Sequence, residues 1–222
     1  KDVETLEEIG LRSVVTFLDE DETASKGEDR LPEGVNEIAA PFRGVVDEDL
    51  SEAVSTAKAS GDFSAVPADY RLQLHRALIE NGADSYAAVV RQIIREDEGA
   101  PLAFHCSQGV HRAGTATAVL LALLGVPQET IREDFLLSNS TRETEIAAKL
   151  DQLRSYASDS LEPSEAMASI ESMEAYHVLD PAYIDASLDA IVEEYGSIEN
   201  YARKRLGLTC GEITKFRDTV LE

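Results

Sequence analysis

The ten residues 105–114, HCSQGVHRAG, constrain the fold more strongly than any other part of the chain. A short apolar run at 101–104 enters this stretch, and a longer apolar run with helical character, 115–124, leaves it. We therefore predict a buried strand, a tight glycine-containing loop and the N-terminus of a helix in direct succession. Such an arrangement makes an anion-binding site, because the N–H groups of the loop and of the helix start point into one small space.

Cys106 and Arg112 add reactive chemistry to this loop. A helix N-terminus and a nearby guanidinium lower the pKa of a cysteine thiol, so that the nucleophilic thiolate is populated at neutral pH. The planar guanidinium of arginine binds two phosphate oxygens at once, which lysine cannot imitate. We expect Cys106 to attack phosphorus, form a phosphocysteine and be released by water. The alternative is that Cys106 is a small buried hydrophobic residue at a strand end.

The backbone of the loop is predicted to hold the phosphate. Its N–H groups curl around three oxygens, and the positive end of the helix dipole points at them. Gly109 and Gly114 are expected to allow positive φ and a close approach of the backbone. The phosphate-binding candidates are Ser107, Gln108, Gly109, Val110, His111 and Arg112.

The four histidines receive different interpretations. His105 ends the predicted strand, and we expect it to hydrogen-bond the loop backbone around Cys106 rather than to transfer a proton. His111 lies beside the arginine and is a general acid, a residue that shapes the rim of the site, or an exposed loop histidine. His75 and His177 fall within helical patterns and are interpreted as surface or packing residues.

Neither a metal nor another cofactor is expected, because no group of histidines and carboxylates has the spacing of metal ligands. The second cysteine, Cys210, lies in a helical tail without a comparable loop and is interpreted as structural. Two cysteines offer no disulfide framework, and a nucleophilic thiol needs reducing surroundings, so we expect a cytoplasmic protein.

The charge balance limits the partners. The 222 residues include 43 acids and 20 bases, for a net charge of −23. Such a field repels nucleic acid and anionic lipid, and no apolar run is long enough to cross a membrane. The acids are spread along a lysine-poor chain, which favours a salt-loving host over an ordinary acidic protein. The sequence begins without Met and without a signal-peptide pattern, so a processed or trimmed end is expected, and it does not indicate an oligomeric state.

A few strands and many helices are predicted, which indicates one α/β domain over 1–222 with a helix-rich C-terminal half. The acidic stretch 19–34 is expected to be an exposed loop. The predicted strands are 11–18, 35–39 and 101–104. The predicted helices are 3–9, 50–60, 68–81, 84–95, 112–124, 127–137, 141–156, 163–176, 181–195, 197–206 and 209–221.

The loop matches the H-C-x5-R pattern of protein tyrosine phosphatases, and residues 6–15, 102–139 and 180–208 resemble the atypical tyrosine/serine phosphatase family of bacteria, fungi and archaea. The resemblance implies a tyrosine phosphatase-like fold with a central, mainly parallel sheet and helices on both faces. It also implies a helical region at 141–176 that covers the site, and a helical tail at 180–222. Cys106 would be the nucleophile and Arg112 the phosphate binder. The implied substrate is a phosphorylated protein or a small phosphomonoester, with phosphotyrosine first and phosphoserine or phosphothreonine next.

Three residues depart from the family loop, C-x-x-G-K-D-R-T-G. Val110 replaces a lysine associated with phosphoinositide activity, which argues against such substrates. His111 replaces an aspartate that is a general-acid candidate, so Asp47 and Asp49 become alternative acids. Ala113 lacks the hydroxyl that helps the thiolate leave the phosphocysteine, which predicts slow turnover.

Two other functions remain open at this point. The departures at His111 and Ala113 are compatible with a phosphate-binding module that has little or no turnover. Sulfur transfer by a rhodanese-like cysteine loop is less favoured, since such loops do not need the continuation from Arg112 into a helix.

Overall fold

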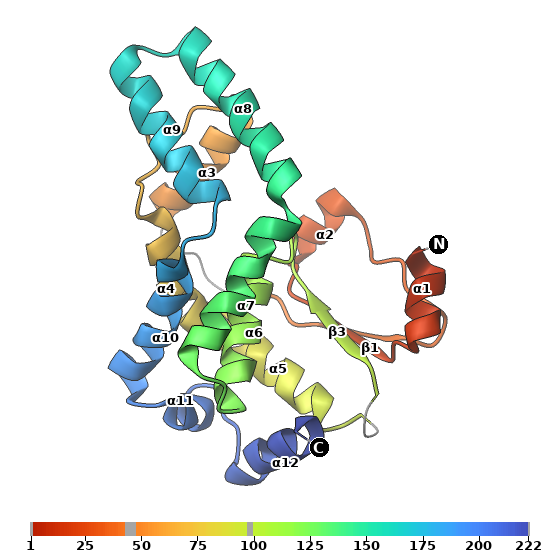
Figure 1. The fold of residues 1–222 in the computed structure, drawn as a ribbon. Helices are drawn as coiled ribbons and strands as arrows, with labels where there is room; N and C mark the ends of the chain where they lie inside the picture. Colours follow the sequence, from red (N-terminus) through yellow and green to blue (C-terminus); the bar gives the residue numbers. More distant parts are fainter. Residues whose placement is uncertain (1, 43–47, 97–99, 222) are drawn as a thin grey trace.

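The fold of this computed structural model is built around a small parallel sheet (Figure 1), and residues 2–42, 48–96 and 100–221 are described. Strands β1 (Ser13–Thr16), β2 (Asn36–Ala39) and β3 (Leu102–His105) lie in the order β2-β1-β3. Both pairings are parallel, and Thr16 at the end of β1 pairs with His105 at the end of β3. The predicted α/β class and parallel sheet are confirmed.

The central strand β1 is shorter than the predicted 11–18 but is buried at all four positions. Its flanking residues still take part in the sheet, since Arg12 N donates to Pro101 O and Phe17 N donates to His105 O, each at 2.9 Å. The edge strand β2 is mostly exposed, as expected for a strand with one neighbour. The carboxyl ends of β1 and β3 therefore meet at one edge of the sheet.

Most of the remaining chain is helical, as predicted. The helices before the central loop are α1 (Asp2–Ile9), α2 (Glu20–Lys26), α3 (Glu48–Ser60), α4 (Tyr70–Asn81) and α5 (Ala83–Ile93). Those after it are α6 (His111–Leu123), α7 (Gln128–Thr141), α8 (Glu143–Ser160), α9 (Pro163–His177), α10 (Pro181–Tyr195), α11 (Ile198–Lys204) and α12 (Cys210–Val220).

Helix α2 corrects the prediction that 19–34 is entirely loop. Its start is stabilised by a capping box, in which Glu22 N donates to the Asp19 carboxylate at 2.8 Å and Asp19 N donates to the Glu22 carboxylate at 3.4 Å. A capping box satisfies N–H groups that the first helical turn leaves without partners. The aspartate and the glutamate three residues later were therefore a local helix signal within an acidic, apolar-poor segment.

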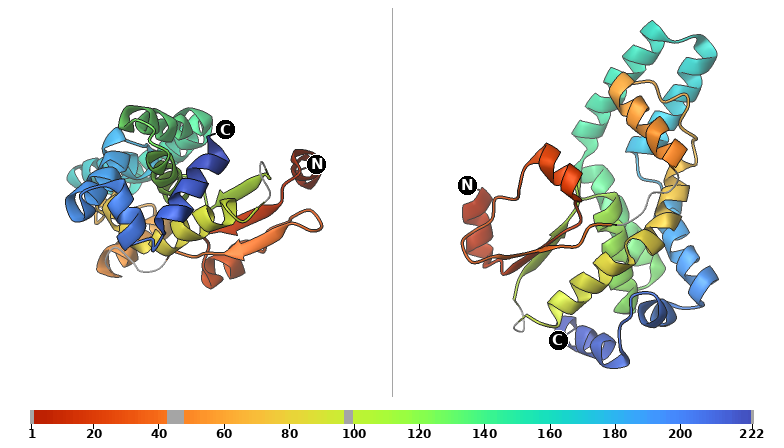
Figure 2. Two further views of the ribbon diagram at one scale, coloured as in Figure 1. Left: turned by 90° about the horizontal axis from the view of Figure 1, so that it is seen from below. Right: turned by 180° about the vertical axis from the view of Figure 1, so that it is seen from behind.

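The helices cover the two faces of the sheet unequally. Helix α5 contacts β1 and helix α6 contacts β3, whereas α1 and α2 lie beyond the sheet on the side away from α6 and α7 (Figures 1 and 2). The main hydrophobic cluster includes Val15, Tyr86, Val119 and Ile184, so it joins the sheet to α5, α6 and α10. The sheet is thus flanked by helices, with most of the buried apolar surface on the side of α5 and α6, and α1 and α2 have no buried residues.

A second hydrophobic cluster lies under α8 and α9, which project from the top of Figure 1 together with α3. It contains Val54, Phe63, Leu153 and Met173, contributed by α3, the segment after α3, α8 and α9. No helix among the described residues is long and apolar enough to cross a membrane.

Candidate active site

The loop between β3 and α6 lines a cavity of about 620 Å³. Cys106, directly after the last residue of β3, is 8% exposed and belongs to the main hydrophobic cluster. Val110, at the other end of the loop, is 2% exposed and precedes the first residue of α6. Gly109 has φ of +67°, the conformation that the sequence predicted for this glycine. Burial at both ends holds the loop in place, and Cys106, Ser107, Gln108, His111 and Arg112 all line the cavity.

The backbone N–H groups of residues 107–112 donate no hydrogen bond to any other residue that the structure describes. The first backbone N–H in this region to do so belongs to Gly114, which donates to Val110 O at 2.9 Å. Six consecutive donors without a described partner, beside a helix N-terminus, are available to an anion with several oxygens. Of these six residues, Ser107, Gln108, His111 and Arg112 line the cavity, whereas Gly109 and Val110 do not.

Arg112 is held by two partners at the carboxyl end of β1. Its Nη1 donates to Phe17 O at 3.0 Å and to Glu22 Oε2 at 2.7 Å, and its Nη2 donates to Glu22 Oε1 at 2.6 Å. Three of the five guanidinium N–H groups are therefore used. The edge formed by Nε and the remaining Nη2 hydrogen has no partner among the described residues, so it can still bind two phosphate oxygens.

Glu22 is a functional candidate that the sequence analysis missed. The hydrogen bonds from Arg112 hold the pKa of Glu22 below its usual value, against the opposing effect of burial. Burial disfavours the charge on Arg112, but the bonds to Glu22 outweigh it and raise the pKa of Arg112. The signal that could have found Glu22 is its position after β1, because residues following neighbouring parallel strands meet at one sheet edge.

His105 contacts the loop backbone, as the sequence predicted. Its Nδ1 lies 3.3 Å from Cys106 O, and its Nε2 lies 2.7 Å from Asp29 Oδ2. Asp29 comes from the segment after α2 and was not predicted to take part. A carboxylate on one ring nitrogen fixes the orientation of the ring, and thereby the contact between the other nitrogen and the backbone of the nucleophile.

His111 is the first residue of α6 rather than an exposed loop residue, and its ring packs edge-on against His75. His111 Nδ1 lies 3.0 Å from His75 Nε2. His75 is 0% exposed and also contacts Ser187 Oγ through Nδ1 at 3.3 Å. The interpretation of His75 as a packing residue is correct as to burial, but this histidine also touches the candidate site.

Both histidines of this pair are neutral at pH 7. Ser187 Oγ donates to His75 O at 2.8 Å, and His75 Nδ1 lies 3.3 Å from that hydroxyl oxygen and 3.4 Å from Thr115 Oγ1. In the neutral pair, one of the two facing nitrogens, His75 Nε2 and His111 Nδ1, donates to the other. Burial, reinforced by Arg71, lowers the pKa of His75 to about 3 and that of His111 well below its ordinary value. His111 is therefore a neutral imidazole at pH 7, which argues against a general-acid role.

Gly114 has a different role from the one expected. Gly114 is not one of the described glycines with positive φ, and it lies within α6 rather than in the loop. A Cβ atom at this position would lie 3.0 Å from Cδ2 and Cε2 of Phe135, so the glycine permits α6 to approach α7 closely. Ala113, beside it, is 7% exposed.

Asp47 and Asp49 are the other two candidates for the general acid. Asp47 lies outside the described residues, and Asp49 falls in the first turn of α3, where its side chain is not described. Phe42 and Ser51, which precede and follow these two aspartates in the sequence, both line the cavity.

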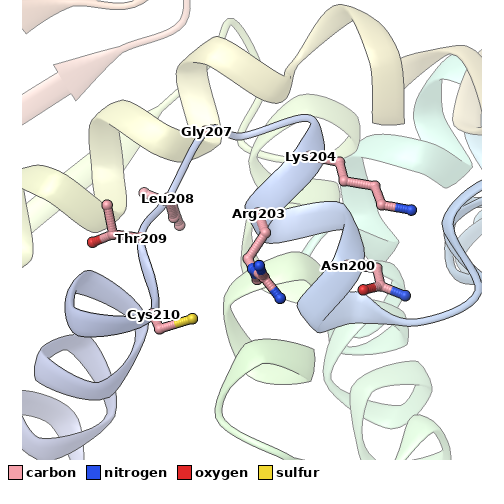
Figure 3. Close-up of a pocket in the computed structure, with 7 residues that line it drawn as sticks. All are labelled: Asn200, Arg203, Lys204, Gly207, Leu208, Thr209 and Cys210. Carbon is pink, nitrogen blue, oxygen red and sulfur yellow. The ribbon is translucent and has the colours of Figure 1, made fainter.

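Cys210 is exposed, which corrects the structural interpretation of this residue. It begins α12 and borders a separate cavity of about 450 Å³, with Arg203 and Lys204 of α11 on the other side (Figure 3). Its Sγ faces the side on which Arg203 lies, whereas Thr209 points the other way. No strand and glycine loop precede it, so the chemistry derived for Cys106 does not apply here.

A buried cysteine at the end of a parallel strand, an arginine with a free binding edge and a row of free N–H groups are the features that a cysteine-dependent phosphatase site requires. Comparison with known proteins agrees with that class. The model of the tyrosine phosphatase family matches residues 1–222, and the chain belongs to this family, whose members hydrolyse phosphoric monoesters.

Two relatives extend the match. The chain is 23% identical over 237 residues to "Triple specificity protein phosphatase PtpB" of Mycobacterium tuberculosis, with 98% of this chain and 84% of the relative covered. It is 27% identical over 214 residues to "Putative tyrosine-protein phosphatase H16_A0669" of Cupriavidus necator, with 96% of this chain and 71% of the relative covered.

Proposed function

We propose that the protein hydrolyses phosphotyrosine through a phosphocysteine formed on Cys106. The observation that carries this proposal is the row of free N–H groups at residues 107–112 around a buried cysteine. The free edge of Arg112 completes a set of donors for the phosphoryl oxygens. Preorganised donors of this kind stabilise the charge that develops in the transition state, and they need no metal ion to do so.

The reaction proceeds in two displacements. The Cys106 thiolate attacks phosphorus, the bond to the tyrosine oxygen breaks, and a general acid donates a proton to that oxygen. Water then attacks the phosphocysteine and loses a proton, which releases inorganic phosphate and regenerates the thiolate. Ala113 supplies no hydroxyl to the departing sulfur, so we expect the second displacement to be slow.

Asp47 and Asp49 are our candidates for the general acid. They are supported by the cavity-lining residues that flank them, Phe42 and Ser51, and by the neutral state of His111. The pH–rate profiles of wild type, His111→Ala, Asp47→Asn and Asp49→Asn test this assignment. Loss of the basic limb in one aspartate variant identifies the acid, whereas its loss in His111→Ala would contradict the argument from the histidine pair.

We also propose a range of substrates. The name of the mycobacterial relative describes three specificities, which supports activity on phosphoserine or phosphothreonine as well. Val110 is 2% exposed and apolar, so it offers no charge to a phosphoinositide headgroup. We further propose that the chain is one domain, with the region at 141–176 covering the site and the tail at 180–222 supporting α4 and α6. Tyr176 of α9, which lines the cavity together with Cys106, supports the covering role.

We propose that the protein works at high salt and in a reducing cytoplasm. The net charge of −23, spread over the chain, supports the first point, because salt screens repulsion between acids. The two free cysteines support the second. Raising KCl from a low to a molar concentration should increase both the melting temperature and kcat/KM. A decrease in both would contradict the salt proposal.

The test of the main proposal is hydrolysis of an aryl phosphate in EDTA at high salt, with vanadate as inhibitor. Cys106→Ser should abolish turnover, and the matched variant Cys210→Ser should retain it. Phosphate binding without turnover between pH 5 and pH 9 would instead favour a phosphate-binding module. Activity that survives Cys106→Ser would exclude the proposed nucleophile.

A further inference from the structure

Arg71 of α4 is a buried cation without an acidic partner. Arg71 as a whole is 4% exposed to solvent. Nε and Nη2 donate to Tyr176 O near the end of α9, at 3.2 and 3.0 Å. Within the described ranges, Nη1 has no hydrogen-bond partner and no carboxylate forms an ion pair with this guanidinium.

A buried charge without a counter-ion is energetically unfavourable, and burial accordingly lowers the pKa of Arg71. Carbonyl oxygens and aromatic faces compensate only part of that cost. Arg71 Cζ lies 3.8 Å from the centre of the Tyr176 ring and 5.3 Å from that of Tyr70. A neutral side chain of similar size could make the same packing contacts without the desolvation cost. Packing alone therefore does not explain a charged residue at this position, whereas binding of an anionic ligand does.

Arg71 faces the cavity that holds Cys106. Lys58 of α3 lines the same cavity and lies 5.4 Å from the centre of the Tyr176 ring, so two cations flank one aromatic side chain. Lys58 is one of only six lysines in the chain. The field of Arg71 reaches the loop, since it contributes to the lowered pKa of His111.

The acidic side chains among the described residues that line the cavity are Asp19 and Glu22. Both belong to the start of α2, where Asp19 caps the helix and Glu22 binds Arg112. Neither forms an ion pair with Arg71 or Lys58. Among the residues whose side chains are described, the charged ones that α3, α4 and α9 contribute to the cavity wall are Lys58 and Arg71, both cationic, in a molecule with a net charge of −23.

We propose that Arg71 and Lys58 form a second anion subsite beside the phosphate-binding loop, and that the preferred substrate is a phosphotyrosine peptide with a further anionic group near the phosphotyrosine. This inference rests on the proposed function and narrows its substrate class. The second group is a carboxylate or a second phosphate, since both present the oxygens that a guanidinium and an ammonium bind.

The competing role for Arg71 is purely structural, as a clamp on the end of α9. The two roles differ in what they predict for selectivity. A clamp affects all substrates by the same factor, whereas a subsite affects only those that carry the second anion. The decisive quantity is therefore a ratio of kcat/KM values for matched peptides, measured at one ionic strength.

The experiment compares three phosphotyrosine peptides that differ at one neighbouring residue, which is glutamate, glutamine or a second phosphotyrosine. Wild type should prefer an anionic neighbour over glutamine by about tenfold, the effect of one charge-assisted contact. Arg71→Met should reduce that ratio to near one. Lys58→Met should reduce it by a smaller factor, and this exposed residue provides a test even where the Arg71 variant does not fold. Lys215→Met, an exposed lysine of α12 away from the cavity, is the matched control and should leave the ratio unchanged.

Comparing kcat/KM for the glutamate peptide with kcat/KM for the doubly phosphorylated peptide shows which anion the subsite accepts. A preference for either of them over the glutamine peptide supports the proposal. Equal kcat/KM for all three peptides in wild type would overturn it, as would a preference that persists in both Arg71→Met and Lys58→Met. Binding of the same peptides to Cys106→Ser provides a readout that needs no turnover. Lack of aryl phosphate hydrolysis by wild type would thus count against the proposed function alone.

Discussion

Replacing Glu22 with glutamine tests how the phosphate-binding arginine is positioned. Glu22 accepts two charge-assisted hydrogen bonds from Arg112, at 2.6 and 2.7 Å, and both side chains are about three-quarters buried, with 22% and 27% exposed. Glutamine keeps one acceptor oxygen but places an NH2 group against the guanidinium and removes the negative charge. The guanidinium is then free to rotate away from the orientation in which its Nε edge faces the loop.

A hydrogen bond to a charged group contributes about 1.5–3 kcal/mol. Since the pair is partly exposed, we take the lower end of that range, which corresponds to roughly a tenfold loss of kcat/KM. The assay is the initial rate of aryl phosphate hydrolysis at saturating and limiting substrate. Glu20→Gln, in the first turn of the same helix and exposed, is the matched control and should stay within twofold of wild type.

The opposite outcome is also informative. If Glu22 competes with phosphate for Arg112 instead of orienting it, Glu22→Gln will bind phosphate more tightly and raise kcat/KM. An unchanged or increased kcat/KM would therefore refute the positioning role that we derive from the two hydrogen bonds.

Three further predictions follow from other contacts. Asp29→Asn should lower kcat by about tenfold with little change in KM, because His105 loses a charged partner at 2.7 Å, and rescue by Asp29→Glu would support an orienting role. The pKa of His75 is lowered to about 3 in the fold. His75 alone should therefore reduce the free energy of unfolding by about 1.4 kcal/mol for each pH unit below pH 6.5. The unfolded chain binds that proton and the folded chain does not, so His75→Gln should flatten the denaturant-measured profile between pH 6.5 and 5. Gly114→Ala should lower the melting temperature by a few degrees, because overpacking against Phe135 costs about 1–3 kcal/mol and the gain in helix propensity is about 1 kcal/mol; an increase would mean that the ring moves freely.

The local part of the site was predictable from the sequence. The order of apolar run, glycine-containing loop and apolar helix fixed the strand, the loop and the helix start around Cys106, because each depends on neighbours within about ten residues. The positive φ of Gly109 followed from the same reasoning. Gly114 was assigned to the loop because its partner, Phe135, lies on another helix and leaves no local pattern.

The side chains that surround the loop could not be found in this way. His75 and Arg71 reach the site from α4, more than 30 residues before Cys106, and helical spacing alone gave them no special role. Glu22 could have been identified from two signals, its place after a parallel strand and the capping box with Asp19. The acidity of the segment pointed to a loop instead, since a helix with no buried residues has no apolar periodicity.

The most direct test of the account is to identify the phosphorylated residue during turnover. Acid quenching of the reaction within the first turnover, followed by mass spectrometry of the peptides, should find one phosphoryl group on Cys106. Because Ala113 leaves the second displacement slow, this intermediate should accumulate and produce a burst of the phenol product. No phosphoryl group should be found in Cys106→Ser. Turnover without a phosphocysteine, or a phosphoryl group on Cys210, would contradict the mechanism proposed for this loop.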